Sequence, residues 1–176
     1  MKSMVELSHE FLKPVLHAQA ICIDATIGNG KDSMFFLNQN VRKVYGFEIQ
    51  EDILEKTKEH VSDVRWIPIL EGHEKMMNYV HEEVDAILFN FGYCPNGNET
   101  ITTLPSTSLE AVKQALMLLK RKGRLVLVLY PHQYGNEEQE TIESYLETLS
   151  QHDFQIYKIQ ALNVKQMPYM IGIEKR

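Results

Sequence analysis

The 176-residue chain has few cysteines, no long apolar run and no excess of positive charge. Its two cysteines, Cys22 and Cys94, fit neither a disulfide framework nor a metal site. No run reaches the ~18 apolar residues of a membrane span. The N-terminus lacks both the apolar core of a signal peptide and the arginine bias of a transit peptide. These absences predict a cytoplasmic protein that needs neither a membrane nor a metal.

Acidic residues outnumber basic ones by 24 to 18, which gives a formal net charge of −6. Broad, nonspecific binding of nucleic acid is therefore disfavoured. A local basic patch is not excluded, and the densest group of cations is Lys120, Arg121, Lys122 and Arg124. At the end of a predicted helix these cations would stabilise the helix dipole, and contact with RNA is the alternative.

Hydrophobic periodicity alternates along the chain between strands and helices, as in an α/β protein with a parallel sheet. Strands are predicted over 20–24, 43–48, 64–70, 84–91, 124–129, 154–161 and 169–174. Helices are predicted over 6–18, 31–39, 52–61, 74–80, 108–120 and 137–149. The length and the absence of linkers indicate one domain over residues 1–176. Ligands of such sheets bind beyond the carboxyl ends of the strands.

The first strand ends in a turn of small residues, in the segment ICIDATIGNGKD at 21–32. The second strand ends at Glu48, about 20 residues further on, where dinucleotide sites place an acid that binds ribose hydroxyls. The turn has no complete G-x-G-x-x-G, and Asp24 would repel a pyrophosphate. A carboxylate suits the cationic tail of S-adenosylmethionine (SAM) better. SAM is thus favoured over NAD, and a plain strand–turn–helix is the alternative.

The residues expected at the cofactor lie in the turns that follow the strands. They are Asp24, Thr26, Gly28, Asn29, Gly30, Asp32, Ser33, Glu48, Ile49, Gln50, His73, Asn90 and Phe91. For His73, an adenine contact and a role as a surface helix cap are both open.

Three residues are predicted to act on the substrate. Asn90 ends the fourth strand and offers an amide for hydrogen bonding, and Tyr93 offers a flat face on which a base could stack. A turn-forming role is the alternative for this polar loop. His132 follows the fifth strand and titrates near neutral pH, so it would either act on a target amine or only orient the substrate.

Several of these motifs together resemble the MnmM/YtqB group of class I methyltransferases. The similarity runs from about residue 7 to the C-terminus through DATIGNGKDS, GFEIQ, EGHE, NFGYCPNGN, LPSTSLEA and IEK. It implies a Rossmann-like class I methyltransferase fold: a seven-stranded, mostly parallel sheet with helices on both faces, whose last strand runs antiparallel.

The resemblance also implies an activity. Members of the group use SAM to methylate the aminomethyl nitrogen of 5-aminomethyl-2-thiouridine at the tRNA wobble position, so the partner would be the anticodon stem-loop region of tRNA. The catalytic domain itself or a homodimer would hold the tRNA, with the N-terminal helix and residues 120–124 as candidate contacts. Methylation of ribosomal RNA or of a small molecule, and a non-catalytic SAM-binding subunit, are the alternatives.

The chain departs from the pattern of the group at three places. Glu48 stands where the group has Asp, and Asn98 replaces an Asp of the loop. The segment 130–133 matches the Y-x-G-H motif only after a shift, so the histidine of the group does not map securely onto His132. An amine whose pKa lies above neutral must lose a proton before it attacks, and the candidate proton acceptors are the Asn90 amide oxygen, the surroundings of Tyr93 and His132.

Overall fold

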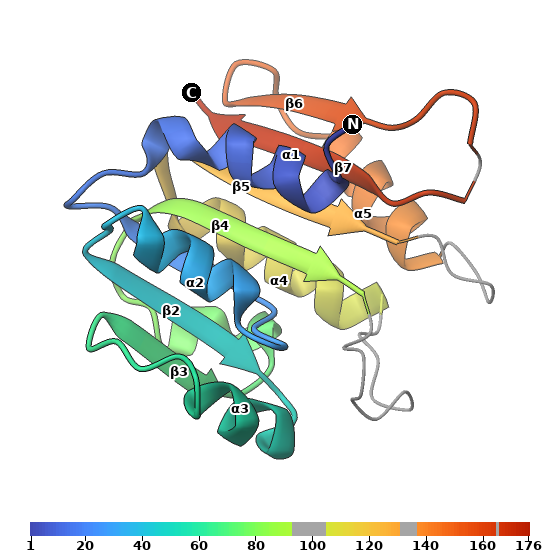
Figure 1. The fold of residues 1–176 in the computed structure, drawn as a ribbon. Helices are drawn as coiled ribbons and strands as arrows, with labels where there is room; N and C mark the ends of the chain where they lie inside the picture. The colour runs from blue at the N-terminus through green and yellow to red at the C-terminus, as the bar shows by residue number, and fades with distance from the viewer. Residues whose placement is uncertain (93–104, 131–136, 165) are drawn as a thin grey trace.

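The computed structural model describes residues 1–92, 105–130, 137–164 and 166–176 (Figure 1). Its strands are β1 (Ile21–Asp24), β2 (Lys43–Glu48), β3 (Trp66–Leu70), β4 (Val84–Phe91), β5 (Leu119–Leu129), β6 (Phe154–Ile159) and β7 (Tyr169–Lys175). Its α-helices are α1 (Met4–Leu12), α2 (Lys31–Asn38), α3 (Glu51–Lys58), α4 (Pro105–Leu118) and α5 (Glu137–Glu147), and two 3₁₀ helices are η1 (Lys13–Val15) and η2 (His73–Asn78). No helix in the described ranges is long and apolar enough to cross a membrane.

The seven strands form one sheet in the order β3-β2-β1-β4-β5-β7-β6. The pairs among β1 to β5 are parallel, whereas β7 pairs antiparallel with both β5 and β6. This arrangement confirms the predicted seven-stranded, mostly parallel sheet. The carboxyl ends of β1, β2 and β4 therefore meet at one edge of the sheet, where the predicted cofactor turns lie.

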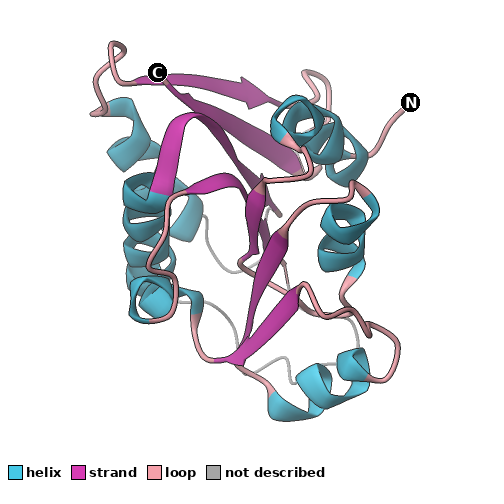
Figure 2. Ribbon diagram, turned by 90° about the vertical axis from the view of Figure 1, so that its left-hand side faces the viewer, coloured by secondary structure: helices cyan, strands magenta, loops and turns pink. Residues whose placement is uncertain are grey.

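Both faces of the sheet are buried, as the apolar strands predict. Ile21 and Ile23 point into a core shared with α4 and α5, whereas Cys22 between them points into a core shared with α1 and α2. Figure 2 shows helices on both sides of the sheet. The side chain of Cys22 is fully buried, so this cysteine is part of the core.

The basic segment after α4 differs from the prediction. A helix to Lys120 and a strand from Arg124 were expected, but α4 ends at Leu118 and β5 begins at Leu119, which pairs with Val84. Lys120 forms an ion pair with the buried carboxylate of Asp85. Because a buried carboxylate is costly without a cation, this contact favours the extended backbone that brings Lys120 to it.

The predicted role of these cations at the helix dipole is therefore wrong. Lys175 takes that role instead, since its Nζ donates to the carbonyl oxygens of Leu116 at 3.1 Å and Leu119 at 2.6 Å. Arg124 bonds to Glu174 at 3.0 Å and to the Phe11 carbonyl at 2.7 Å. The start of β5 also lies at the amino ends of the parallel strands, on the opposite edge of the sheet from the predicted site.

Two of the predicted helices contain 3₁₀ structure. The helix expected over 6–18 ends at Leu12 and continues as η1, because Pro14 cannot donate the next helical hydrogen bond. The helix expected over 74–80 is the 3₁₀ helix η2.

Candidate active site

Hydrogen bonds to a buried carboxylate hold the turn after β1 in place. Asp24 accepts the Ser33 hydroxyl at 2.6 Å and the Thr26 N–H at 3.2 Å. Gly28 and Gly30 have φ of +49° and +75°, a left-handed conformation that residues with a Cβ rarely adopt. A Cβ on Gly30 would also lie 2.7 Å from a methyl carbon of Thr57. The glycines are thus required by the shape of the turn.

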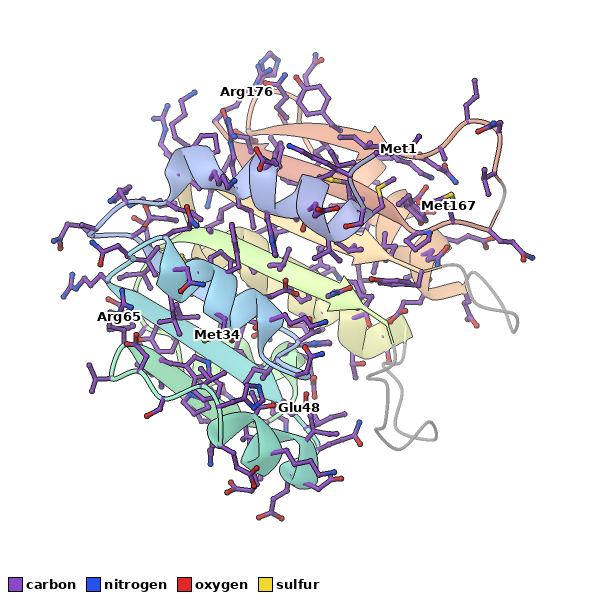
Figure 3. All side chains as sticks on the ribbon, in the orientation of Figure 1. Met1, Met34, Glu48, Arg65, Met167 and Arg176 are labelled. Atoms are coloured by element: carbon purple, nitrogen blue, oxygen red, sulfur yellow. The ribbon has the colours of Figure 1, made fainter. Side chains whose placement is uncertain are left out.

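Glu48 ends β2 beside the same turn, as its label in Figure 3 shows. Its two carboxylate oxygens accept the N–H groups of Gly28 and Gln50, each at 3.0 Å. Each oxygen keeps a second lone pair, so the carboxylate can still accept from a ligand hydroxyl. The neighbouring Ile49 is exposed.

Two carboxylates, Asp24 and Asp32, are buried together below the turn. Asp24 is fully buried and Asp32 is 5% exposed. Burial, followed by the charge of Asp32, raises the pKa of Asp24 to about 7. A cationic ligand would relieve this repulsion, so the pair suits a ligand with a positive group.

Asn90 closes the site from the end of β4. Its N–H donates to the Thr26 hydroxyl at 2.9 Å, and its Nδ2 donates to the Asp32 carboxylate at 3.4 Å. Its carbonyl oxygen Oδ1 is buried and has no hydrogen-bond partner among the described residues. Buried polar atoms are nearly always paired, so this oxygen is an acceptor that a ligand donor could use.

His9 was missed by the sequence analysis. Its Nε2 lies 2.7 Å from Asp32 Oδ1, and its ring stacks on Phe35 with a centroid distance of 3.8 Å. In the sequence it is only a polar residue of an amphipathic helix, 23 positions before Asp32. No spacing rule connects the two residues, and only the docking of α1 beside α2 brings them together.

His73 lies at the site but is buried, with 7% exposure. Its Nδ1 bonds to the Ala25 carbonyl at 3.1 Å, and its ring packs edge-on against Phe89 and Phe91. Burial lowers its pKa, which favours the neutral imidazole. The expected role as a surface helix cap is wrong, because Gly72 is the N-cap of η2 and His73 instead fastens the turn after β1. The adenine contact stays a prediction.

Some of the predicted site residues lie outside the part of the chain that the structure describes. Tyr93 and His132 lie outside the described residues, and so does Cys94. The edge of the sheet brings together Asp24, Thr26, Asp32, Ser33, Glu48, His73 and Asn90. Within the part of the chain that the structure describes, no three metal-binding side chains converge.

The sequence matches, over residues 44–174, a family described as "Putative rRNA methylase". The chain belongs to this family. It is also 33% identical to the chloroplastic tRNA (mnm⁵s²U34)-methyltransferase of Arabidopsis thaliana, a match that covers 99% of this chain and 70% of that protein.

Two solved structures of similar methylases share the whole fold. A "putative rRNA-methylase" of Clostridium thermocellum has a TM-score of 0.93 at 31% identity. A "putative methyltransferase" of Streptococcus mutans, solved with S-adenosylhomocysteine (SAH), has a TM-score of 0.91 at 37% identity. Each match covers 100% of this chain and 99% of the other. The predicted class I methyltransferase fold and family are confirmed, and this family member is a SAM-dependent methyltransferase.

Proposed function

We propose that this family member methylates the aminomethyl nitrogen of 5-aminomethyl-2-thiouridine at the wobble position of tRNA. The observation that carries the proposal is the buried, unpaired Oδ1 of Asn90. An amine has N–H donors and needs such an acceptor, whereas a ring carbon does not. The name of the Arabidopsis relative, a tRNA (mnm⁵s²U34)-methyltransferase, supports this substrate.

The residues at the edge of the sheet fit SAM. Glu48 would accept the ribose hydroxyls, and the turn from Thr26 to Gly30 would cover the cofactor. The Asp24–Asp32 pair would balance the positive charges of the amino-acid tail and the sulfonium, and those charges would offset the burial and repulsion that raise the pKa of Asp24. When bound, SAM supplies the methyl group.

Asn90 would hold the substrate amine by accepting one of its hydrogens at Oδ1. When the amine is neutral, this contact uses one N–H and leaves the lone pair free to attack, and it fixes the direction of the nitrogen. The contribution of the protein is then mainly proximity and orientation. Tyr93, as a stacking face, and His132, as a proton acceptor, stay predictions, as do a homodimer and a cytoplasmic location.

Methylation of ribosomal RNA is the second candidate, and the description of the family favours it. Both substrates present a nucleoside to the same edge of the sheet, so the geometry of Asn90 does not separate them. The identity of the RNA requires a direct assay.

The test is an assay with purified protein, SAM and RNA from a strain that lacks the modification. The tRNA and the ribosomal RNA are digested separately, and the modified nucleosides of each are identified by mass spectrometry. We expect the aminomethyl nucleoside of tRNA to gain one methyl group, and Asn90→Ala to slow this gain by about 100-fold. Methylation of ribosomal RNA alone would contradict the tRNA proposal and leave the methyltransferase assignment intact.

A further inference from the structure

We propose that His9, on the N-terminal helix, is a positioning residue for methyl transfer: through Asp32 it holds the Asn90 amide with its oxygen toward the substrate. The inference rests on the proposed role of Asn90 as the acceptor of the substrate amine. It adds a residue that neither the sequence motifs nor the similar proteins assign.

Three side chains from three elements form one connected row. His9 of α1 contacts Asp32 of α2, and Asp32 accepts from Asn90 of β4. Asp32 uses a different carboxylate oxygen for each neighbour, Oδ1 for His9 and Oδ2 for Asn90. A change at His9 is therefore transmitted to Asn90 through a single carboxylate.

The row decides which way the Asn90 amide faces. An amide has a donor end and an acceptor end that can exchange by rotation. If the Asn90 amide were reversed, Oδ1 would face the Asp32 carboxylate, and two acceptors would oppose each other. With Asp32 in place, Nδ2 is the end that faces it, and Oδ1 is left buried and unpaired. The orientation needed to receive an amine is thus set by Asp32.

His9 in turn fixes Asp32. Its side chain is 20% exposed, so its contact with the 7% exposed carboxylate is largely shielded from water. Its ring is held parallel to Phe35. The helix that carries it starts with a capping box between Ser3 and Glu6, and it is anchored to β5 where Arg124 bonds to the Phe11 carbonyl. A site residue on a rigid helix is placed more firmly than one on a loop.

Two substitutions separate the contact with Asp32 from the packing on Phe35. His9→Phe keeps an aromatic ring on Phe35 and removes the ring nitrogen that faces Asp32. His9→Gln keeps a donor for Asp32 and removes the ring. His17 provides the matched control, because its Nε2 lies 3.4 Å from another buried carboxylate, Asp85, at the opposite edge of the sheet.

The first readout is the rate of methyl transfer at saturating SAM and tRNA. We expect His9→Phe to lower kcat by about tenfold, the size of one hydrogen-bond contribution, with KM for tRNA and the Kd of SAM within about threefold. His9→Gln and His17→Phe should stay within about threefold of the parent. The proposal is overturned if His9→Phe retains full kcat, or if His9→Gln loses as much as His9→Phe.

The second readout needs no RNA substrate. The side-chain NH₂ signals of Asn90 are assigned in an NMR spectrum by their loss in Asn90→Asp, and their hydrogen exchange is measured. Exchange should become faster in His9→Phe by about tenfold and stay unchanged in His17→Phe. Unchanged exchange in His9→Phe would overturn the positioning role even if tRNA is methylated. If exchange becomes faster in His9→Phe but tRNA is not methylated, the positioning role stands and the proposed substrate is wrong.

Discussion

Asp85 and Asp24 are buried carboxylates on neighbouring strands, at opposite edges of the sheet. Asp85, at the start of β4, accepts the Ile21 N–H at 2.9 Å and is paired with Lys120. Asp24, at the end of β1, has neutral donors and a second carboxylate, Asp32, beside it. At the amino edge the chain neutralises its own charge, and at the carboxyl edge it leaves negative charge for a ligand.

Under the proposed function, this difference separates polar groups that stabilise the fold from polar groups that would bind ligands. Near Asp85 a cation of the chain supplies the balancing charge. Near Asp24 and Asp32 the pKa of one carboxyl group is raised and the Asn90 oxygen is unpaired. Both are unfavourable in the protein alone and become favourable when a cation and an amine donor arrive. Substitutions at the two edges should therefore change different quantities.

The largest effect is expected from Asp85→Ala, and it should fall on stability. The substitution leaves the buried Ile21 N–H without its acceptor and removes the ion pair of Lys120, whose side chain is 38% exposed, so the free energy of unfolding should drop by about 3 kcal/mol. Urea denaturation measures the drop. At temperatures where the variant is folded, kcat should match the parent. A large loss of kcat in folded Asp85→Ala would contradict the division between the two edges.

The next largest effect is expected from Asn90→Ala, and it should fall on kcat instead of on stability. Removing the amine acceptor should lower kcat by about 100-fold, or ~2.7 kcal/mol of barrier. The Kd of SAM should change by less than about threefold, or ~0.7 kcal/mol. Single-turnover kinetics and calorimetry measure the two quantities, with Asn38→Ala on the exposed end of α2 as the control. Equal loss of SAM binding and turnover would make Asn90 part of the cofactor site instead.

Glu48→Ala should weaken SAM binding by roughly 1–3 kcal/mol, because buried ribose hydroxyls would lose a charged acceptor. Calorimetry with SAM measures the change, and NAD is the control ligand. Glu48→Gln should lie between the parent and Glu48→Ala, since it can still accept one of the N–H groups of Gly28 and Gln50. Tighter binding of NAD than of SAM to the parent would refute the cofactor reasoning.

The two edges were not equally predictable from the sequence. At the carboxyl edge, apolar runs end abruptly at Asp24, Glu48 and Asn90, so strand ends and site coincide in the pattern. At the amino edge, the polar run 120–124 hides the first half of β5. Its extended conformation depends on the ion pair of Lys120 with Asp85, 35 positions earlier, which no local pattern contains.

The two histidines of the site also show how far the sequence alone can predict side-chain contacts. His73 follows β3 and lies beside the turn after β1, but the polar sequence EGHE gives no sign of its burial against Phe89 and Phe91. His9 reaches Asp32 only because α1 docks on the sheet beside α2. Residues at strand ends follow from periodicity, whereas partners from a packed helix require the fold.

The smallest expected effect concerns pH and the Asp24 carboxyl. Its pKa is about 7 in the folded protein and ordinary, ~3.8, in the unfolded chain. The folded state thus holds the proton more tightly, and the contribution of this group to stability is full below the unfolded pKa and lost as pH rises through about 7. Without ligand, the free energy of unfolding should fall by about 1 kcal/mol from this group between pH ~6 and pH ~8.

Comparison with Asp24→Asn isolates this dependence, because the lowered pKa of His73 gives an opposite slope that both proteins share. Urea denaturation across this pH range should show the extra fall in the parent alone. A cationic ligand stabilises the ionised carboxyl, so the parent should also bind SAM more tightly at the higher pH, and Asp24→Asn should lose this preference. Identical slopes in the two proteins would mean that the carboxyl edge is neutralised by the chain itself, as the amino edge is at Asp85.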